Sequence, residues 1–274
     1  MNKFLLSLVV CVLLPINMSS AKPHNILRLA TTTSTENSGL LTYLLPEFEK
    51  QTGYQVRVIS VGTGKALRMG RDGDADVLLV HAPSAEQDFM ASGYGEQRVS
   101  VMHNDFVLVG MLDDAANVSN VSSLTQALHS IEAHNSLFIS RGDDSGTHKK
   151  ELDLWKAAGI SPIAPWYREV GQGMGKVLQM AAEMQAYTLT DRGTWLAFQG
   201  KPSPVKEVLK IVYEKAQPLL NPYSMMTLSR QNHPDLNHEA ANELIDWIVS
   251  KQAQNLIAEF KVQGQQLFVP DALR

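Results

Sequence analysis

The chain alternates two kinds of apolar pattern. Short runs in which apolar residues alternate with polar ones, or follow one another without a break, predict strands. These predicted strands are residues 25–30, 54–60, 76–80, 106–111, 136–140, 209–213 and 223–229. Helical patterns separate most of them, and residues 186–198 read as a further strand followed by a helix. Strands alternating with helices predict an α/β fold with largely parallel sheets.

Two of the helical patterns carry specific expectations. Leu40, Leu44 and Phe48 repeat at helical spacing, but Pro46 lies among them and is expected to kink or shorten this helix, because proline removes a backbone donor. Residues 237–260 show one long amphipathic pattern, which predicts a long C-terminal helix.

The first residues are typical of an export signal. Lys3 precedes an apolar stretch, residues 4–16, and small residues end at Ala21, so we predict that residues 1–21 are a signal peptide cleaved after Ala21. A membrane anchor is the alternative, but the stretch is shorter than the roughly 20 residues that span a bilayer. Cleavage leaves 253 of the 274 residues, enough for two lobes with cores of their own.

Cleavage also removes Cys11, the one cysteine, so no disulfide is expected in the mature chain. The net charge is −4 for the whole chain and −5 without Lys3. This mild acidity gives no support for nucleic-acid binding. It also requires that any bound anion be captured by local geometry, because the overall field repels it.

Three turns between a predicted strand and a predicted helix are rich in Gly, Ser and Thr: residues 31–38, 62–64 and 145–147. A helix N-terminus leaves N–H groups unpaired and carries partial positive charge, and hydroxyls add neutral donors. Such a turn suits a small oxyanion. Helix capping explains any one of them equally well. Three in one chain favour a shared ligand.

The third turn also contains an arginine. Arg141 stands four residues before Ser145, Gly146 and Thr147, and its guanidinium is a permanently charged fork that fits an oxyanion. Asp143 lies between them. The alternative role for Arg141 is therefore a structural ion pair with a neighbouring aspartate.

The wider pattern resembles a known family. The segments "TTTSTENSGLL", "VGTGKAL", "GDADVLLVHAP", "SRGDDSGTHKKELDLW", "AYTLTDRGTW" and "LLNPY" are similar to the tungstate-binding periplasmic components of ABC transporters, relatives of molybdate- and phosphate-binding proteins. The resemblance implies a type II periplasmic-binding-protein fold, with two α/β lobes joined by a two-segment hinge. We place one lobe at residues 22–105 and 225–274 and the other at residues 106–224.

The resemblance and the chemistry of the turns together imply a ligand site. Similarity places Thr33, Ser34 and Thr63 on the first lobe, and Arg141, Ser145, Gly146 and Thr147 on the second. Thr188 occupies the position of a tyrosine in a related molybdate protein. The complete set of candidates is Thr32, Thr33, Ser34, Thr63, Gly64, His81, Arg141, Ser145, Gly146, Thr147 and Thr188.

His81 bears on which anion is bound. Phosphate is partly protonated at neutral pH, and similar phosphate proteins place an aspartate five residues after the counterpart of Asp76, which is the position of His81 here. A carboxylate would repel a bare dianion such as tungstate, whereas an imidazole can donate. The alternative is a strand-end histidine held by a backbone hydrogen bond.

The expected function is therefore capture of tungstate, or of molybdate, by a monomeric binding protein in the periplasm that delivers it to a membrane permease. Phosphate or sulfate capture on the same fold is one alternative. A secreted serine hydrolase using Ser145 and His148 is another, although no nucleophile-elbow motif is present. No cofactor and no metal ligand set is expected, because the histidines are scattered.

Overall fold

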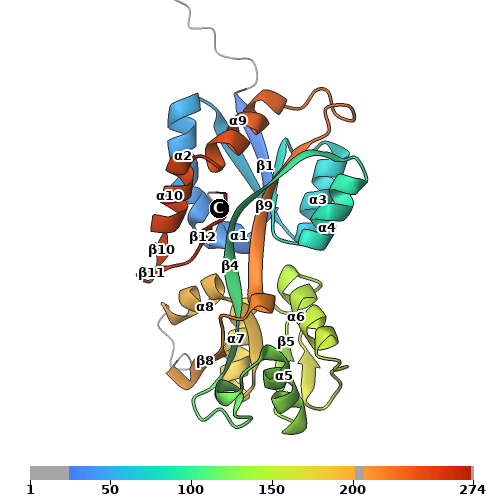
Figure 1. Cartoon of the computed structure of the whole chain (residues 1–274), viewed down its shortest axis with the longest axis vertical. Coiled ribbons are helices and arrows are strands. Elements are labelled where there is room, and N and C mark those ends of the chain that lie inside the picture. The colour runs from blue at the N-terminus through green and yellow to red at the C-terminus, as the bar shows by residue number, and fades with distance from the viewer. Residues whose placement is uncertain (1–24, 201–206, 273–274) are drawn as a thin grey trace, which may run out of the picture.

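The computed structural model describes residues 25–200 and 207–272, so the predicted signal peptide, residues 1–21, lies outside the described part. Two α/β lobes are stacked along the long axis of the molecule, and two long strands, β4 (Gly95–Met111) and β9 (Leu220–Leu228), run between them (Figure 1). This is the two-lobed α/β architecture that the sequence predicts.

The first lobe contains the N-terminal strands and the C-terminal helices. Three parallel strands form its centre: β1 (Ile26–Thr32), β2 (Gln55–Val61) and β3 (Val77–Val80). Their sheet continues through β9 and β4 to the short β12 (Val269–Pro270), in the order β12-β4-β9-β3-β1-β2. The helices are α1 (Thr33–Asn37), α2 (Leu40–Thr52), α3 (Thr63–Asp72), α4 (Pro83–Ala91), α9 (His238–Ile248) and α10 (Lys251–Glu259).

The second lobe takes the middle of the chain. Its strands are β5 (Phe138–Ser140), β6 (Tyr167–Glu169), β7 (Thr188–Asp191) and β8 (Leu209–Tyr213), and the last two pair with the far end of β4. Its helices are α5 (Leu124–Ala133), α6 (Gly146–Ala157), α7 (Met174–Glu183) and α8 (Arg192–Gln199), with short 3-10 turns at Val118–Asn120 and Gln217–Leu219. Short strands β10 (Lys261–Val262), β11 (Gln265–Gln266) and β12 (Val269–Pro270) follow α10.

The expectation of largely parallel sheets is wrong for the strands that join the lobes. β4 pairs antiparallel with β9, β7, β8 and β12, and β9 pairs antiparallel with β3. The physical reason is the course of the chain, which leaves the first lobe along β4 and returns along β9 in the opposite direction. The parallel pattern holds for β1, β2 and β3, where helices connect successive strands.

Two helix predictions differ from the structure, the first only in the length of the helix. Helix α2 runs from Leu40 to Thr52 with Pro46 inside it, so the proline does not shorten the helix. The predicted C-terminal helix is two helices, because Ser250 caps the start of α10 by accepting a hydrogen bond from the Ala253 N–H. The apolar side of both helices is buried, as expected, with Leu244, Ile248 and Ile257 in the main core.

Helix α6 carries a buried carboxylate on its inner side. Glu151 is 3% exposed, and its Oε1 accepts hydrogen bonds from the Tyr167 hydroxyl (2.7 Å) and the Trp155 indole (3.3 Å). Burial raises the pKa of Glu151 to about 7. The pKa of a glutamate in an unfolded chain is about 4.3. The folded protein therefore holds this proton more tightly than the unfolded chain does.

Stability is expected to fall as pH rises from about 4 through 7, because Glu151 must then ionise in place, at a cost on the order of 3 kcal/mol. Glu151→Gln keeps the acceptor oxygen and removes the titration. We expect its melting temperature to exceed that of the wild type by roughly 5–10 °C at pH 8, and the difference to shrink toward pH 4. Thermal melts across this range measure it, and parallel curves would contradict the assignment.

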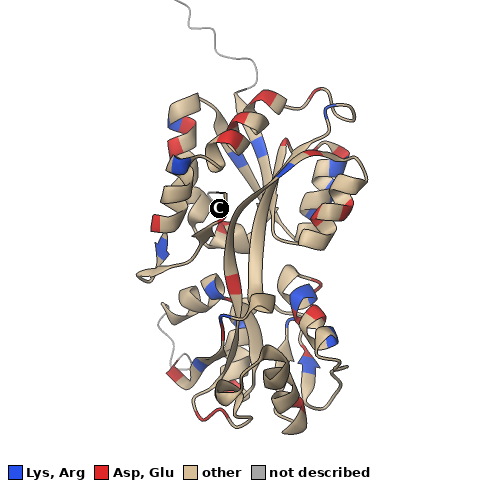
Figure 2. Cartoon of the chain, in the orientation of Figure 1, with Lys and Arg blue, Asp and Glu red and all other residues tan. Residues whose placement is uncertain are grey.

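Charged side chains of both signs are interspersed over the outer helices and loops of both lobes (Figure 2). Figure 2 thus shows no large area of one charge sign among the described residues on the face in view. In residues 25–200 and 207–272, no helix combines the length and apolar character needed to cross a membrane.

Candidate functional site

The first predicted turn is a compact group of hydroxyls. β1 ends at Thr32, which caps α1: its Oγ1 accepts from the Thr35 N–H (3.2 Å). The same oxygen lies 2.7 Å from Thr35 Oγ1 and 3.1 Å from Ser34 Oγ. Thr33, the first residue of α1, is exposed. The turn thus serves as a helix cap and also gathers three hydroxyls.

His81 follows β3 and faces this turn. Its Nε2 lies 3.0 Å from Thr32 Oγ1 and 3.3 Å from Ser34 Oγ, and its Nδ1 lies 3.0 Å from Asn221 Oδ1. The ring stacks on Tyr223 at 4.6 Å. Burial lowers the pKa of His81, and this effect outweighs the Asn221 hydrogen bond and the charge of a nearby aspartate, so the imidazole is neutral at neutral pH. Side chains, not the backbone hydrogen bond considered above, hold the ring.

A second buried carboxylate fixes the turn that carries His81. Glu86, which is 0% exposed, accepts a hydrogen bond from the N–H of Ala82 (2.7 Å) and pairs with Arg98 (2.8 Å). Burial raises the pKa of Glu86, although the hydrogen bonds from Arg98 and Ala82 oppose the shift. The residue after His81 is therefore tied to α4 and β4.

Sequence reasoning did not single out Asn221 or Asn104. They face each other on β9 and β4, and the Asn221 Nδ2 donates to Asn104 Oδ1 (2.7 Å). Both side chains are nearly buried, at 3% and 4% exposure. The one available signal was the presence of Asn221 in the "LLNPY" segment.

The second and third predicted turns approach each other where the lobes meet. Gly62 caps α3 without a side chain, so Thr63 and Gly64 begin this helix. Gly146 begins α6 in the other lobe, and a Cβ placed on it would lie 3.9 Å from Thr63 Oγ1 and 3.4 Å from His81 Cε1. The structure therefore brings together Thr32, Ser34, Thr63, His81 and Gly146, from both lobes.

Arg141 has an ion-pair partner within its own turn. Its Nε donates to Asp143 Oδ2 (3.1 Å), an Nη donates to the same oxygen, and Asp143 Oδ1 accepts from the Ser145 N–H (3.2 Å). Burial alone would raise the pKa of Asp143, but the hydrogen bonds from Arg141 and Ser145 outweigh it and hold the pKa below its ordinary value. The alternative ion pair is thus present, and it ties Arg141 to the start of α6.

Two further candidates lie deeper in the second lobe. Thr147 is the second residue of α6 and is 7% exposed. Thr188 is 1% exposed at the start of β7, and its hydroxyl donates to the carbonyl of Ile139 (2.7 Å). The Thr188 hydroxyl proton is therefore used within the second lobe.

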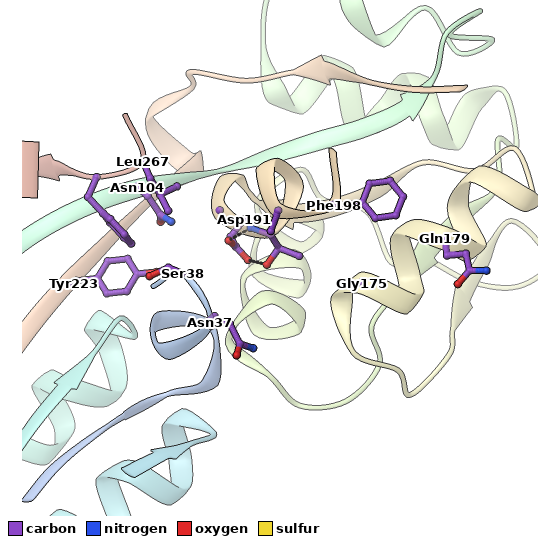
Figure 3. Close-up of a pocket in the computed structure, with 14 residues that line it drawn as sticks. Asn37, Ser38, Asn104, Gly175, Gln179, Asp191, Phe198, Tyr223 and Leu267 are labelled. Atoms are coloured by element: carbon purple, nitrogen blue, oxygen red, sulfur yellow. Dashed lines mark hydrogen bonds between the residues drawn. The ribbon is translucent and has the colours of Figure 1, made fainter. Parts of the chain in front are cut away.

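A cavity of about 630 Å³ lies beside the group of hydroxyls, between the lobes (Figure 3). Among the predicted site residues, Ser34 lines it. Asn37 and Tyr223 line it from one side, and Gln179 and Asp191 from the other. Asp191 caps α8, because its oxygens accept from the Thr194 N–H (2.8 Å) and hydroxyl (2.6 Å). One carboxylate, not expected from the sequence, thus faces the space between the lobes.

Ser145 and His148, the two residues of the serine-hydrolase alternative, make contacts with other groups and not with each other's side chain. Ser145 Oγ caps α6 by accepting from the backbone N–H of His148 (3.3 Å). The His148 ring accepts from the Asp144 N–H at Nδ1 (3.2 Å), and its Nε2 lies 3.0 Å from Glu169 Oε1. Both ring nitrogens therefore face groups other than Ser145. Within the described ranges, no three His, Cys, Asp or Glu side chains gather closely enough to hold a metal ion.

Two α/β lobes joined by two strands, with polar helix starts facing each other where the lobes meet, define the class of type II periplasmic binding proteins. The PBP superfamily domain matches residues 19–252. A curated tungstate-binding protein TupA of Peptoclostridium acidaminophilum is 48% identical over 90% of this chain and 86% of its own length. A putative ABC transporter anion-binding protein of Haloferax volcanii is 45% identical over 90% of this chain and 72% of its own length.

A solved structure, the tungstate-binding protein TupA from Desulfovibrio alaskensis G20, superposes with a TM-score of 0.81 at 43% identity, over 90% of this chain and 98% of that one. The chain belongs to the PBP superfamily and, within it, to the family of the TupA proteins. The resemblance inferred from the sequence is thereby confirmed.

Proposed function

We propose that this chain binds tungstate between its two lobes and delivers it to the membrane permease of an ABC importer, with molybdate as a competing ligand. The observation that carries the proposal is the approach of two helix N-termini from different lobes, with Gly146 beside Thr63 and His81. Such helix starts present unpaired N–H groups and partial positive charge to a common point.

The hydrogen-bond donors at these starts support the same reading. In α6, the Ser145 N–H donates to Asp143 and the His148 N–H to Ser145 Oγ. The N–H groups of Gly146 and Thr147, which lie between these two, have no hydrogen-bond acceptor among the described residues. In α3, the cap residue has no side chain to satisfy the N–H groups of the first turn. The first turns of both helices therefore keep N–H groups that an anion placed between the lobes can accept from.

We assign the candidate residues roles on this basis. Ser34, Thr63 and Gly64 line the anion from the first lobe with Thr33, and Arg141, Ser145, Gly146 and Thr147 from the second. Asp143 fixes Arg141 through Nε and one Nη, which leaves donors of the guanidinium for the ligand. Thr32 and His81 support the first-lobe hydroxyls, and Thr188 supports the sheet behind the second turn.

We further propose the setting in which this binding occurs. The lobes comprise residues 22–105 with 225–274, and residues 106–224, and they close on the anion as a monomer. The chain acts in the periplasm after loss of residues 1–21, binds without catalysing a reaction, and needs no cofactor. The names of its relatives as tungstate- or anion-binding proteins support binding without catalysis.

Asp191 favours a second candidate, phosphate. Its carboxylate lines the cavity that Ser34 also lines, and such a carboxylate can accept the proton of hydrogen phosphate. Tungstate and molybdate are bare dianions that this charge repels. We favour tungstate because relatives at 48% and 43% identity are named tungstate-binding proteins, and because both Asp191 oxygens are already engaged by Thr194 in capping α8.

Calorimetric titration of the ligand-free mature protein with tungstate, molybdate, sulfate and phosphate tests the function. We expect tight tungstate binding and weak phosphate binding. Asp191→Asn keeps the helix cap, since Asn and Asp cap equally well. This variant is expected to bind tungstate at least as tightly as the wild type. Tight phosphate binding that this substitution abolishes would instead establish the phosphate candidate.

A further inference from the structure

The strands that join the lobes carry a chain of polar side chains that ends at the anion site. Asn104 on β4 and Asn221 on β9 are register partners, and Asn221 reaches His81, whose other ring nitrogen contacts Thr32 and Ser34. Buried polar groups are retained where their hydrogen bonds are satisfied. Asn104, Asn221, His81 and Thr32 each have a hydrogen-bond partner within this chain, and none of the four is an exposed surface group.

The direction of each hydrogen bond follows from the amide of Asn221. Its Nδ2 donates to Asn104 Oδ1 (2.7 Å) and lies 3.2 Å from the Tyr223 hydroxyl. Its Oδ1 therefore faces His81 Nδ1 as an acceptor, and Nδ1 carries the imidazole proton. In a neutral imidazole the other nitrogen, Nε2, is then an acceptor. Tyr223 and Asp191 are the titratable groups near the ring.

An acceptor at Nε2 orders the hydroxyls of the first turn. Thr32 Oγ1 lies closer to Nε2 (3.0 Å) than Ser34 Oγ does (3.3 Å), so we assign the single lone pair of Nε2 to the Thr32 proton. Thr32 Oγ1 in turn accepts from the Thr35 N–H and the Thr35 hydroxyl, which fills its two lone pairs. The Ser34 hydroxyl proton then has no remaining acceptor in this group, and Ser34 lines the space between the lobes.

We propose that Asn221, oriented by Asn104, is a positioning residue that holds His81 in its Nδ1–H tautomer and so directs the Ser34 hydroxyl proton toward the bound oxyanion. This inference rests on the proposed function. A proton on Nε2 would permit several arrangements of the same hydroxyls, since Thr32 would then donate to Ser34 or to Thr35. The asparagine pair removes that freedom before the anion arrives, which is preorganisation of a donor.

Nitrogen NMR of the imidazole rings tests the tautomer directly in the ligand-free wild-type protein labelled with ¹⁵N-histidine. We expect His81, assigned by the loss of its signals in His81→Gln, to show a protonated Nδ1 and an unprotonated Nε2. The nitrogen signals of His103, whose Nδ1 lies 2.9 Å from Asp271 Oδ1, serve as the internal chemical-shift reference. A protonated Nε2 in the wild type would overturn the inference without any further variant.

The role of Asn221 is tested by Asn221→Leu, which has a similar volume and no acceptor. We expect the His81 proton to move to Nε2 and tungstate affinity to fall about tenfold. The control is Asn232→Leu, because Asn232 is exposed and donates only to the carbonyl of Gly93 among its side-chain contacts. An unchanged tautomer and affinity in folded Asn221→Leu would refute the positioning role. A wild type that does not bind tungstate would refute the proposed function instead.

Discussion

Replacing Arg141 by glutamine is expected to weaken tungstate binding by about 100-fold or more while the protein stays folded. A hydrogen bond to a charged group contributes about 1.5–3 kcal/mol, and a guanidinium offers more than one such bond to an oxyanion. The loss of one or two of them corresponds to this factor, since each 1.4 kcal/mol is about tenfold. Asp143 would also lose its counter-ion and remain as an unpaired charge near the anion.

The fold is expected to tolerate this change because the partner of Arg141 is two residues away in the same turn, so no distant elements depend on the pair. A partly exposed ion pair contributes only about 0–1 kcal/mol. Calorimetry and thermal melts separate the two effects. Arg168→Gln, which changes an exposed arginine of the same lobe, is the matched control and should bind as the wild type. Equal affinities in the two variants would remove Arg141 from the site.

Arg141→Gln leaves the carboxylate of Asp143 unpaired, and a second substitution separates the effect of this charge from the loss of the guanidinium. Arg141→Gln combined with Asp143→Asn removes both members of the pair, so the unpaired carboxylate no longer repels the anion. We expect this double variant to recover part of the lost affinity, since neutral donors of α6 and α3 remain. Arg141→Lys keeps the charge without the fork and should fall between the wild type and Arg141→Gln.

Local patterns predicted strands of both lobes and the turns of the site. β8 matches the predicted range of residues 209–213, and β1 and β2 differ from prediction by one or two residues. Period-two alternation and Gly, Ser and Thr at helix starts are local signals, and they act through contacts within a few residues. The sequence could therefore predict which turns are rich in donors.

Local signals of this kind could not predict which distant strands pair with each other. β4 begins at Gly95, well before the predicted residue 106, because its polar first half is stabilised by β9, more than 100 residues later in the chain. For the same reason Asn104 and Asn221 read as ordinary polar residues until the register places them together. Asp191 was equally hidden, since a helix-capping aspartate gives no sign of which space it faces.

Gly146→Val is expected to weaken tungstate binding by about 10- to 100-fold. A Cβ at this position is tolerated, because it would meet His81 Cε1 at 3.4 Å and Thr63 Oγ1 at 3.9 Å. The two γ-carbons of valine extend further and have to displace His81 or hold the lobes apart. Overpacking of this kind costs about 1–3 kcal/mol, which corresponds to the expected loss of affinity.

Gly146→Ala is the matched control for this prediction, because its Cβ makes ordinary contacts and its affinity should stay near that of the wild type. Gly146→Ala should also melt near the wild-type temperature, since its Cβ would meet no atom closer than 3.4 Å. Small-angle scattering with saturating tungstate distinguishes a held-open form from a displaced His81. A Gly146→Val protein that binds tungstate as tightly as the wild type would show that the two helix starts do not enclose the anion.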